Sequence, residues 1–199
     1  VGGRELPVTF ESGAEVFAIS VTGGSLTIAD VVTIEGDFSA GPNEFAGRDL
    51  TVFVGDGPAF LEDGSRNPLA RGLLITGATV GFVTSGGLYA LDVRGSVELV
   101  GFAGVSFSGQ VRVRVNETTG VVDQTVVFPD GGGDVVVAFS GAEVAGADPF
   151  VSVAGVDLQV SVLGQVFSGD LSFAKTASGL TVSATNLALV FRAGGTQVA

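Results

Sequence analysis

Two neighbouring segments of this 199-residue chain alternate strictly between apolar and polar residues. In the segment 89–99 the apolar residues are Tyr89, Leu91, Val93, Val97 and Leu99. The segment 105–116 alternates more regularly still, with Val or Phe on one phase and Ser, Gln, Arg and Asn on the other. Successive residues of a β-strand point to opposite faces of a sheet, so each segment is predicted to be a strand with one face on a core and one in water.

The same two-residue period continues through the rest of the chain. Further strands are predicted at 16–21, 25–29, 33–39, 50–54, 73–76, 79–83, 124–128, 135–140, 151–154, 157–162, 165–173, 180–185 and 187–191. Turn-forming residues at 85–87, 116–120, 130–134 and 177–179 predict hairpin loops. No segment has the helical period. The predicted fold is therefore all-β, with mostly antiparallel strands and hairpins in an elongated β-sandwich or a wrapped, solenoid-like sheet, and with no significant helix.

The chain also repeats itself. Segments 17–21, 33–39 and 50–52 match 150–153, 166–172 and 180–182 at an offset of about 130 residues. We therefore expect a lead-in or linking strand at 1–15, a first β repeat module at 16–149, and the start of a second copy at 150–199 packed on the first. A shorter motif with a central glycine recurs at Gly36, Gly95, Gly109 and Gly169, where it predicts a bulge or a bend.

Composition limits the partners and the chemistry. The formal net charge is −12, so the surface field repels nucleic acid, which we exclude as a partner. The chain has no His and no Cys, and it therefore lacks the commonest general base and the best transition-metal ligands. Carboxylates such as Asp92 and Glu98 are predicted on a solvent face, without an aromatic platform for a sugar. We expect no catalytic residues and no enzymatic activity. Polar residues interrupt every apolar run, and we expect no membrane insertion.

Calcium is the one cofactor for which the sequence offers candidate ligands. They are Asp56, Glu62, Asp63 and Asn67 in a long loop, or Asp130 and Asp134 on either side of three glycines. Hard oxygen ligands on a glycine-bent backbone suit Ca²⁺. Neither loop has EF-hand or nonapeptide spacing, and acids that form turns and aid solubility are the favoured interpretation.

Two further groups of residues have structural interpretations. Arg112 and Arg114 are expected to pair with acidic residues on neighbouring strands. Phe107, Phe167 and Phe173 fall on the apolar phase of their strands and are expected to pack in a core.

The strand-and-turn pattern resembles a known kind of protein. The run Tyr89-Ala-Leu…Gly95…Val105-Ser-Phe-Ser-Gly…Val111-Arg-Val-Arg-Val-Asn116, followed by Val162-Leu-Gly-Gln-Val-Phe-Ser-Gly-Asp-Leu-Ser-Phe173, is similar to tandem β-rich modules of giant secreted or cell-surface bacterial proteins. The resemblance implies an adhesin-like or surface-layer building module, located outside the cell or at its surface. It carries no active site.

Three functions follow as expectations. The first is a spacer or stalk module in a repetitive surface protein, with neighbouring repeat modules as its partners. The second is a subunit of a secreted filament, in which identical subunits join by β-strand pairing at an edge strand near 7–10 or 187–191. The third is a calcium- or carbohydrate-binding module.

Overall fold

A computed structural model describes residues 19–28, 31–193 and 196–198 of the chain. These residues form β-strands, turns and loops without a helix, so the predicted all-β, antiparallel fold is confirmed. No helix within the described ranges is long and apolar enough to cross a membrane. The expected lead-in at 1–15, the start of the strand at 16–21 and the candidate edge at 7–10 lie outside the described residues.

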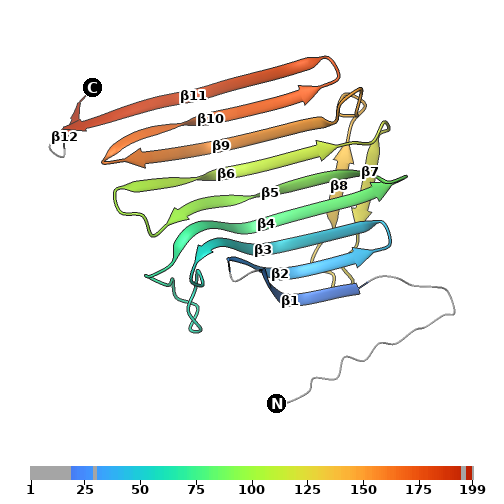
Figure 1. Ribbon diagram of the computed structural model, residues 1–199, viewed down its shortest axis with the longest axis horizontal. Helices are drawn as coiled ribbons and strands as arrows, with labels where there is room; N and C mark the ends of the chain where they lie inside the picture. Colours follow the sequence, from blue (N-terminus) through green and yellow to red (C-terminus); the bar gives the residue numbers. More distant parts are fainter. Residues whose placement is uncertain (1–18, 29–30, 194–195, 199) are drawn as a thin grey trace, which may run out of the picture.

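Ten strands form one antiparallel sheet, and two more form a separate hairpin (Figure 1). The strands are β1 (Ile19–Ile28), β2 (Val32–Gly41), β3 (Glu44–Asp56), β4 (Arg71–Ser85), β5 (Leu88–Val100), β6 (Val105–Asn116), β7 (Val122–Val126), β8 (Val135–Phe139), β9 (Phe150–Val162), β10 (Gln165–Thr176), β11 (Gly179–Ala193) and β12 (Thr196–Val198). The sheet order is β1-β2-β3-β4-β5-β6-β9-β10-β11-β12. The chain therefore builds the sheet as a meander, interrupted once by the β7–β8 hairpin.

The interruption begins at a loop that was predicted to be a hairpin turn. Loops 85–87, 130–134 and 177–179 do join paired strands, as predicted. The prediction is wrong for 116–120, because β6 pairs with β9 and the loop carries the chain to a second layer. Asn116 fixes both ends of this excursion. Its side-chain oxygen accepts the Thr118 N–H at 2.9 Å, and its amide donates to the Glu143 carbonyl at 2.8 Å.

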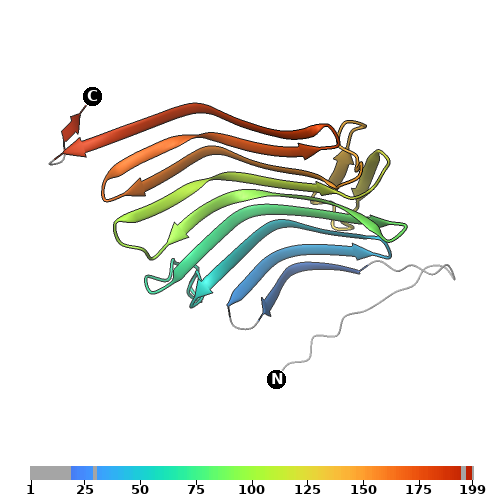
Figure 2. The ribbon, with the colours of Figure 1, turned by 45° about the horizontal axis from the view of Figure 1, so that its top comes forward.

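A line of β-bulges crosses the sheet near the middle of the long strands. The extra residues have a left-handed backbone at Gly23, Asp49, Gly77, Asp157 and Asn186, in β1, β3, β4, β9 and β11. The strands bend along this line (Figure 2). Each bulge shifts the alternation by one residue, so the strands predicted separately at 73–76 and 79–83 are one strand, β4. The predicted pairs at 151–162 and 180–191 merge into β9 and β11 for the same reason.

The recurrent glycines lie opposite these bulges. Gly36, Gly109 and Gly169 are close to leucines that follow the bulge residue of the neighbouring strand: a Cβ on these glycines would lie 2.8, 2.8 and 2.5 Å from a Cδ atom of Leu50, Leu158 and Leu187. The glycine motif therefore marks the place where a leucine from the next strand folds over the backbone. The bulge itself belongs to that next strand.

An aspartate after the glycine caps the bulge in two places. Asp37 accepts the Gly23 N–H at 2.9 Å, and Asp170 accepts the Asp157 N–H at 2.8 Å. The bond from Asp157, and a second one from the Asn186 amide, lower the pKa of Asp170 below its ordinary value. These capped bulges are the structural basis of the matching Gly-Asp segments at 33–39 and 166–172. The assignment of two repeat modules stays a prediction.

The sheet has one apolar face and one polar face. Paired residues of neighbouring strands point the same way, and one row across the sheet reads Val80, Val93, Val113, Val153, Phe173 and Val182. The adjacent row, on the other face, reads Gly81, Asp92, Arg114, Ser152, Ala174 and Thr181. We call these two surfaces the apolar face and the polar face.

The hairpin covers part of the polar face. It lies behind the sheet in Figure 1, and β7 and β8 run across the direction of the sheet strands. Its buried residues, Val122, Val126, Phe128, Val135, Val137 and Phe139, pack on Ala46, Val83, Ala90 and Phe150. Small residues make this contact close, since a Cβ on Gly81 would lie 2.4 Å from Val137. A second, smaller core holds Phe53 and Leu74 under the loop between β3 and β4.

The sequence predicts that the apolar side of each strand is buried in a core, but the apolar face of this sheet is partly exposed. Phe167 and Phe173, which were predicted to lie in a core, are exposed on this face. The described residues supply a second layer on the polar side of the sheet only. The alternation correctly identifies two faces. The hairpin, however, packs on the polar face, where small residues such as Ala and Gly leave room for it.

Candidate functional site

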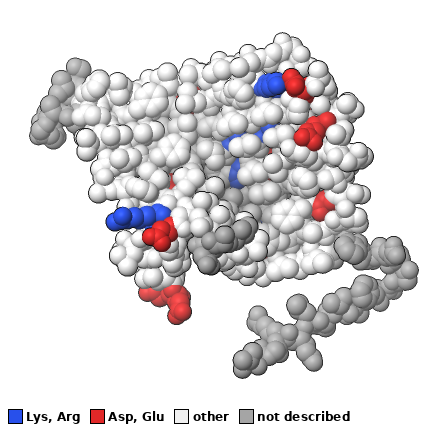
Figure 3. Space-filling view, in the orientation of Figure 1, with Lys and Arg blue, Asp and Glu red and all other residues white. Residues whose placement is uncertain are grey.

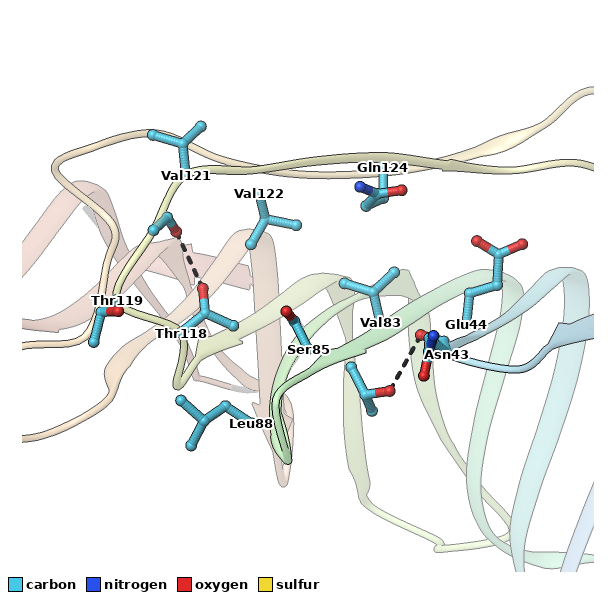
Figure 4. A pocket seen from close by; sticks show the side chains of 12 residues that line it. Asn43, Glu44, Val83, Ser85, Leu88, Thr118, Thr119, Val121, Val122 and Gln124 are labelled. Atoms are coloured by element: carbon cyan, nitrogen blue, oxygen red, sulfur yellow. Dashed lines mark hydrogen bonds between the residues drawn. The ribbon is translucent and has the colours of Figure 1, made fainter.

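A pocket lies beside the hairpin, at one end of β7 (Figure 4). Its volume is about 430 Å³. The lining residues come from the β2–β3 turn, the β4–β5 hairpin and the chain around β7: Asn43, Glu44, Val83, Thr84, Ser85, Leu88, Thr118, Thr119, Gly120, Val121, Val122 and Gln124. The polar groups are mainly hydroxyls and amides, and Glu44 is the one carboxylate among them. Such a lining can hydrogen-bond a small polar molecule or water.

Two of the hydroxyl groups that line this pocket have internal partners. The Thr118 hydroxyl donates to the Gly120 carbonyl at 3.1 Å, and the Thr84 hydroxyl donates to the Asn43 carbonyl at 3.4 Å. Glu44 has no second carboxylate in the lining with which to divide acid and base roles. The pocket is therefore a polar depression with a single carboxylate in its lining.

The first candidate calcium loop uses its oxygen atoms for its own turns. Asp63 accepts the hydroxyl and the N–H of Ser65 at 2.6 and 2.9 Å, and these bonds lower the pKa of Asp63. The Asn67 oxygen accepts the Leu69 N–H at 3.0 Å. Asp56 stands at the end of β3, paired in register with Arg71. The loop is thus organised by local hydrogen bonds, as the turn-forming interpretation expects.

The second candidate calcium loop holds an arginine. Asp130 forms a short ion pair with Arg48, and Arg48 also donates to the Gly133 carbonyl at 2.6 Å. The Gly132 N–H and the Arg48 guanidinium together lower the pKa of Asp130. Asp134 accepts the Phe128 N–H at 3.0 Å.

These bonds leave little for a metal ion to bind. Arg48 supplies the positive charge that a metal would bring to the turn between β7 and β8. Across residues 19–28, 31–193 and 196–198, no three acidic side chains gather in a way that could hold a metal ion.

Arg48 also ties the hairpin to the sheet. It lies on β3 at the bulge, and only 9 % of its side chain is exposed. It contacts Asp37 of β2 at 3.3 Å, and its guanidinium stacks 4.2 Å from the centre of the Phe128 ring. These contacts join two sheet strands and the hairpin turn, so the turn between β7 and β8 is docked on the sheet.

A second arginine cluster docks the other end of the hairpin. Arg112 and Arg114 pair with Asp92 on β5 at 2.5 and 3.3 Å, which confirms the expected cross-strand pairing. Arg114 also pairs with Glu143, donates to the Ala138 carbonyl at 2.5 Å, and lies 4.4 Å from the centre of the Phe139 ring. The hairpin therefore rests on paired charges as well as on apolar contacts.

This cluster corrects one prediction about the carboxylates. Asp92 was expected on a solvent face, but it is only 8 % exposed, because the face that alternation marks as polar lies partly under the hairpin. Glu98 is exposed and pairs with Arg66 at 2.8 Å. The two carboxylates serve different ion pairs. Sequence reasoning missed the roles of Arg48 and Glu143, since the partners that link them between sheet and hairpin, Asp130 and Arg114, lie 82 and 29 positions away along the chain.

The edges of the sheet form the third candidate site. Within the described part of the chain, no strand pairs with the outer edge of β1, nor with the outer edge of β11 between Gly179 and Val190. Neither β1 nor this part of β11 contains a charged residue or a proline. Natural sheets usually protect an open edge with such residues, and an unprotected edge can pair with another strand.

Together these features define a class: an all-β protein with one large antiparallel sheet, a docked hairpin and two edges that no described strand covers. Comparisons of the chain with protein-family models, with curated proteins and with solved structures give no match.

Proposed function

We propose that this chain is a structural building module of a repetitive extracellular protein, acting as a spacer or stalk at the cell surface. The observation that supports this proposal is the recurrence of one strand unit, a glycine facing a bulge, across a sheet whose edges are open and uncharged. A sheet of this kind can grow by adding strands of similar modules.

The proposed role has a physical scale. Strands in a sheet are spaced about 4.8 Å apart, so the nine long strands extend roughly 40 Å across the sheet. Modules that pair edge to edge would add this length for each copy, with backbone hydrogen bonds linking one module to the next. In this proposal the acids that cap the bulges, and the acids that pair with arginines under the hairpin, have structural roles.

Protease treatment of intact cells tests the location. If the module belongs to a surface protein, brief proteolysis of whole cells releases peptides of this sequence, while peptides of a cytoplasmic marker stay inside. Peptides that appear only after lysis would contradict the proposal.

A second candidate function is a subunit of a secreted filament. The outer edge of β11 between Gly179 and Val190 is uncharged and has no partner among the described strands. This favours a filament subunit, because separate chains could pair there as well as modules of one chain can. The mass of the native polypeptide in denaturing conditions separates the two functions. A spacer stays a much larger polypeptide, whereas a filament dissociates into chains of about 20 kDa.

A further inference from the structure

The apolar face of the sheet is continuous over all nine long strands. Away from the strand ends, and apart from the extra residue of each bulge, every described side chain on it is Gly, Ala, Val, Leu, Ile, Phe or Tyr. Fifteen of its large apolar residues are exposed: Ile19, Val21, Leu26, Val54, Val105, Val153, Val162, Phe167, Leu171, Phe173, Leu180, Val182, Leu187, Leu189 and Phe191. Figure 3 looks onto this face: acidic side chains lie mainly at its margins, and some Lys or Arg atoms show between the apolar residues near its middle.

The size of this face points to a partner. Strands of 10 to 15 residues rise about 3.3 Å per residue and lie about 4.8 Å apart, which gives the face an area of roughly 1,700 Å². The largest apolar patch on an ordinary monomer is roughly 300–600 Å². Two such faces in contact would bury roughly 3,400 Å², within the range of obligate homodimers.

The distribution of charge favours a second copy as that partner. The chain carries a net charge of −12, but outside the bulges the charged side chains on the apolar face lie at strand ends, at Asp56, Arg71 and Lys175. Lys175 is already paired with Asp148 at 3.0 Å. Two apolar faces can therefore meet without bringing unpaired charges together. A lipid surface fits less well, since interfacial binding favours Trp and basic residues, and the chain has no Trp and only nine Lys and Arg.

We propose that a second copy of this chain packs on the apolar face, sheet against sheet. The two sheets would lie about 10 Å apart with their side chains interdigitated, as in a β-sandwich. Leu171 and Phe173 of β10 and Val182 of β11, which are exposed in the single chain, are then buried. This contact uses the face of the sheet, so it does not depend on strand pairing at the edges.

Sedimentation equilibrium of the purified chain tests the proposal with two matched variants. Leu171 and Ser172 are adjacent, exposed residues of β10 that point to the apolar and the polar face. The wild-type chain is expected to sediment at twice its mass of 19.9 kDa. Leu171→Asp should weaken the dimer at least about 100-fold, because it buries an unpaired carboxylate in each copy. Ser172→Asp should leave the dimer unchanged.

Thiol labelling gives an independent measurement, because the chain has no native cysteine. Val182→Cys and Ser183→Cys place single thiols on the two faces of β11, both at exposed positions of the single chain. In the dimer, maleimide should react with the Val182→Cys thiol at least about 10-fold more slowly than with the Ser183→Cys thiol. Dilution below the dissociation constant should remove the difference. This result stands even if Leu171→Asp fails to fold.

Several outcomes would overturn the proposal. A wild-type chain that stays monomeric up to millimolar concentration has no self-contact on this face. A dimer that Leu171→Asp and Ser172→Asp affect equally, with both thiols reactive, is joined at its edges. A monomer whose Val182→Cys thiol is protected only by phospholipid vesicles binds a lipid surface. The edge-joined dimer would leave the spacer function intact.

Discussion

Replacing Arg114 with methionine removes the cation that joins the sheet to the hairpin. Arg114 contacts Asp92 and Glu143 and donates to a carbonyl of β8, and 15 % of its side chain is exposed. Methionine keeps most of the apolar stem, so its packing on Phe139 is largely retained. The change therefore measures the charge and its hydrogen bonds.

The expected loss of stability follows from the burial of the partners. Breaking a buried ion pair from one side costs about 3–5 kcal/mol, because an uncompensated charge remains. Arg112 still neutralises Asp92, and 25 % of the Glu143 side chain is exposed, so the cost lies at or somewhat below the lower end of this range. We expect the free energy of unfolding to fall by about 2–3 kcal/mol, a large part of the 5–15 kcal/mol typical of a domain.

Arg66→Met is the matched control for this experiment. Arg66 also pairs with a glutamate and also lies over a phenylalanine ring, but its side chain is 46 % exposed. An exposed pair contributes about 0–1 kcal/mol. Urea unfolding followed by circular dichroism compares the two variants. If the two variants lose equal free energy of unfolding, or if Arg114→Met loses less than about 1 kcal/mol, the claim that removing Arg114 leaves a buried charge uncompensated is refuted.

Four further predictions concern pH, packing, backbone and calcium. The folded-state pKa values of Asp130 and Glu143 lie below their ordinary values of 3.8 and 4.5. Hydrogen bonds from Gly132 and Arg48 lower the pKa of Asp130. Burial raises the pKa of Glu143, but hydrogen bonds from Ser140 and Arg114 outweigh this effect. The stability that they contribute is therefore present at neutral pH and lost as pH falls through the folded values, so urea midpoints should stay level from about pH 7 to 5 and fall below about pH 4; a midpoint that rises on acidification would contradict this. Gly81→Ala should cost about 1–3 kcal/mol in urea unfolding, because its Cβ would overlap the hairpin, whereas Gly120→Ala, with open space around it, should cost less than about 0.5 kcal/mol. Asp157→Gly should be nearly neutral in the same assay and Asp157→Val should cost about 1–2 kcal/mol, because φ is +51° there; equal effects would argue against the bulge. Millimolar calcium should leave the melting temperature unchanged relative to EDTA, since an arginine already neutralises Asp130.

Local chemistry in the sequence accounts for much of the fold. Alternation in 89–99 and 105–116 predicts β5 and β6, and the turn residues at 85–87 and 177–179 predict two of the hairpins. The pairing of Arg112 and Arg114 with an acid also follows from alternation, because charged residues on neighbouring strands share a face. These features depend on residues that are close in sequence or on adjacent strands.

The errors come from places where the period breaks. An extra residue at Gly77 or Asp157 reverses the phase of alternation, so one strand looks like two short ones. The first half of β3, from Glu44 to Asp49, was missed because charged residues and a bulge hide its period. The ion pair in the second candidate calcium loop could not be predicted either, because Arg48, which binds Asp130, is 82 positions away from it.

By itself, the sequence determined the all-β class, most of the strands and the division of each strand into an apolar and a polar side, because these depend on a period of two residues. Only the tertiary structure decided which side the hairpin covers. That choice depends on whether small residues such as Gly81 and Ala90 leave room for Val137 and Phe139, and on arginines that meet their acids across long distances in the chain. The alternating pattern identifies the apolar face of the sheet, but the shape and charge of residues distant in the sequence determine what packs on the polar face.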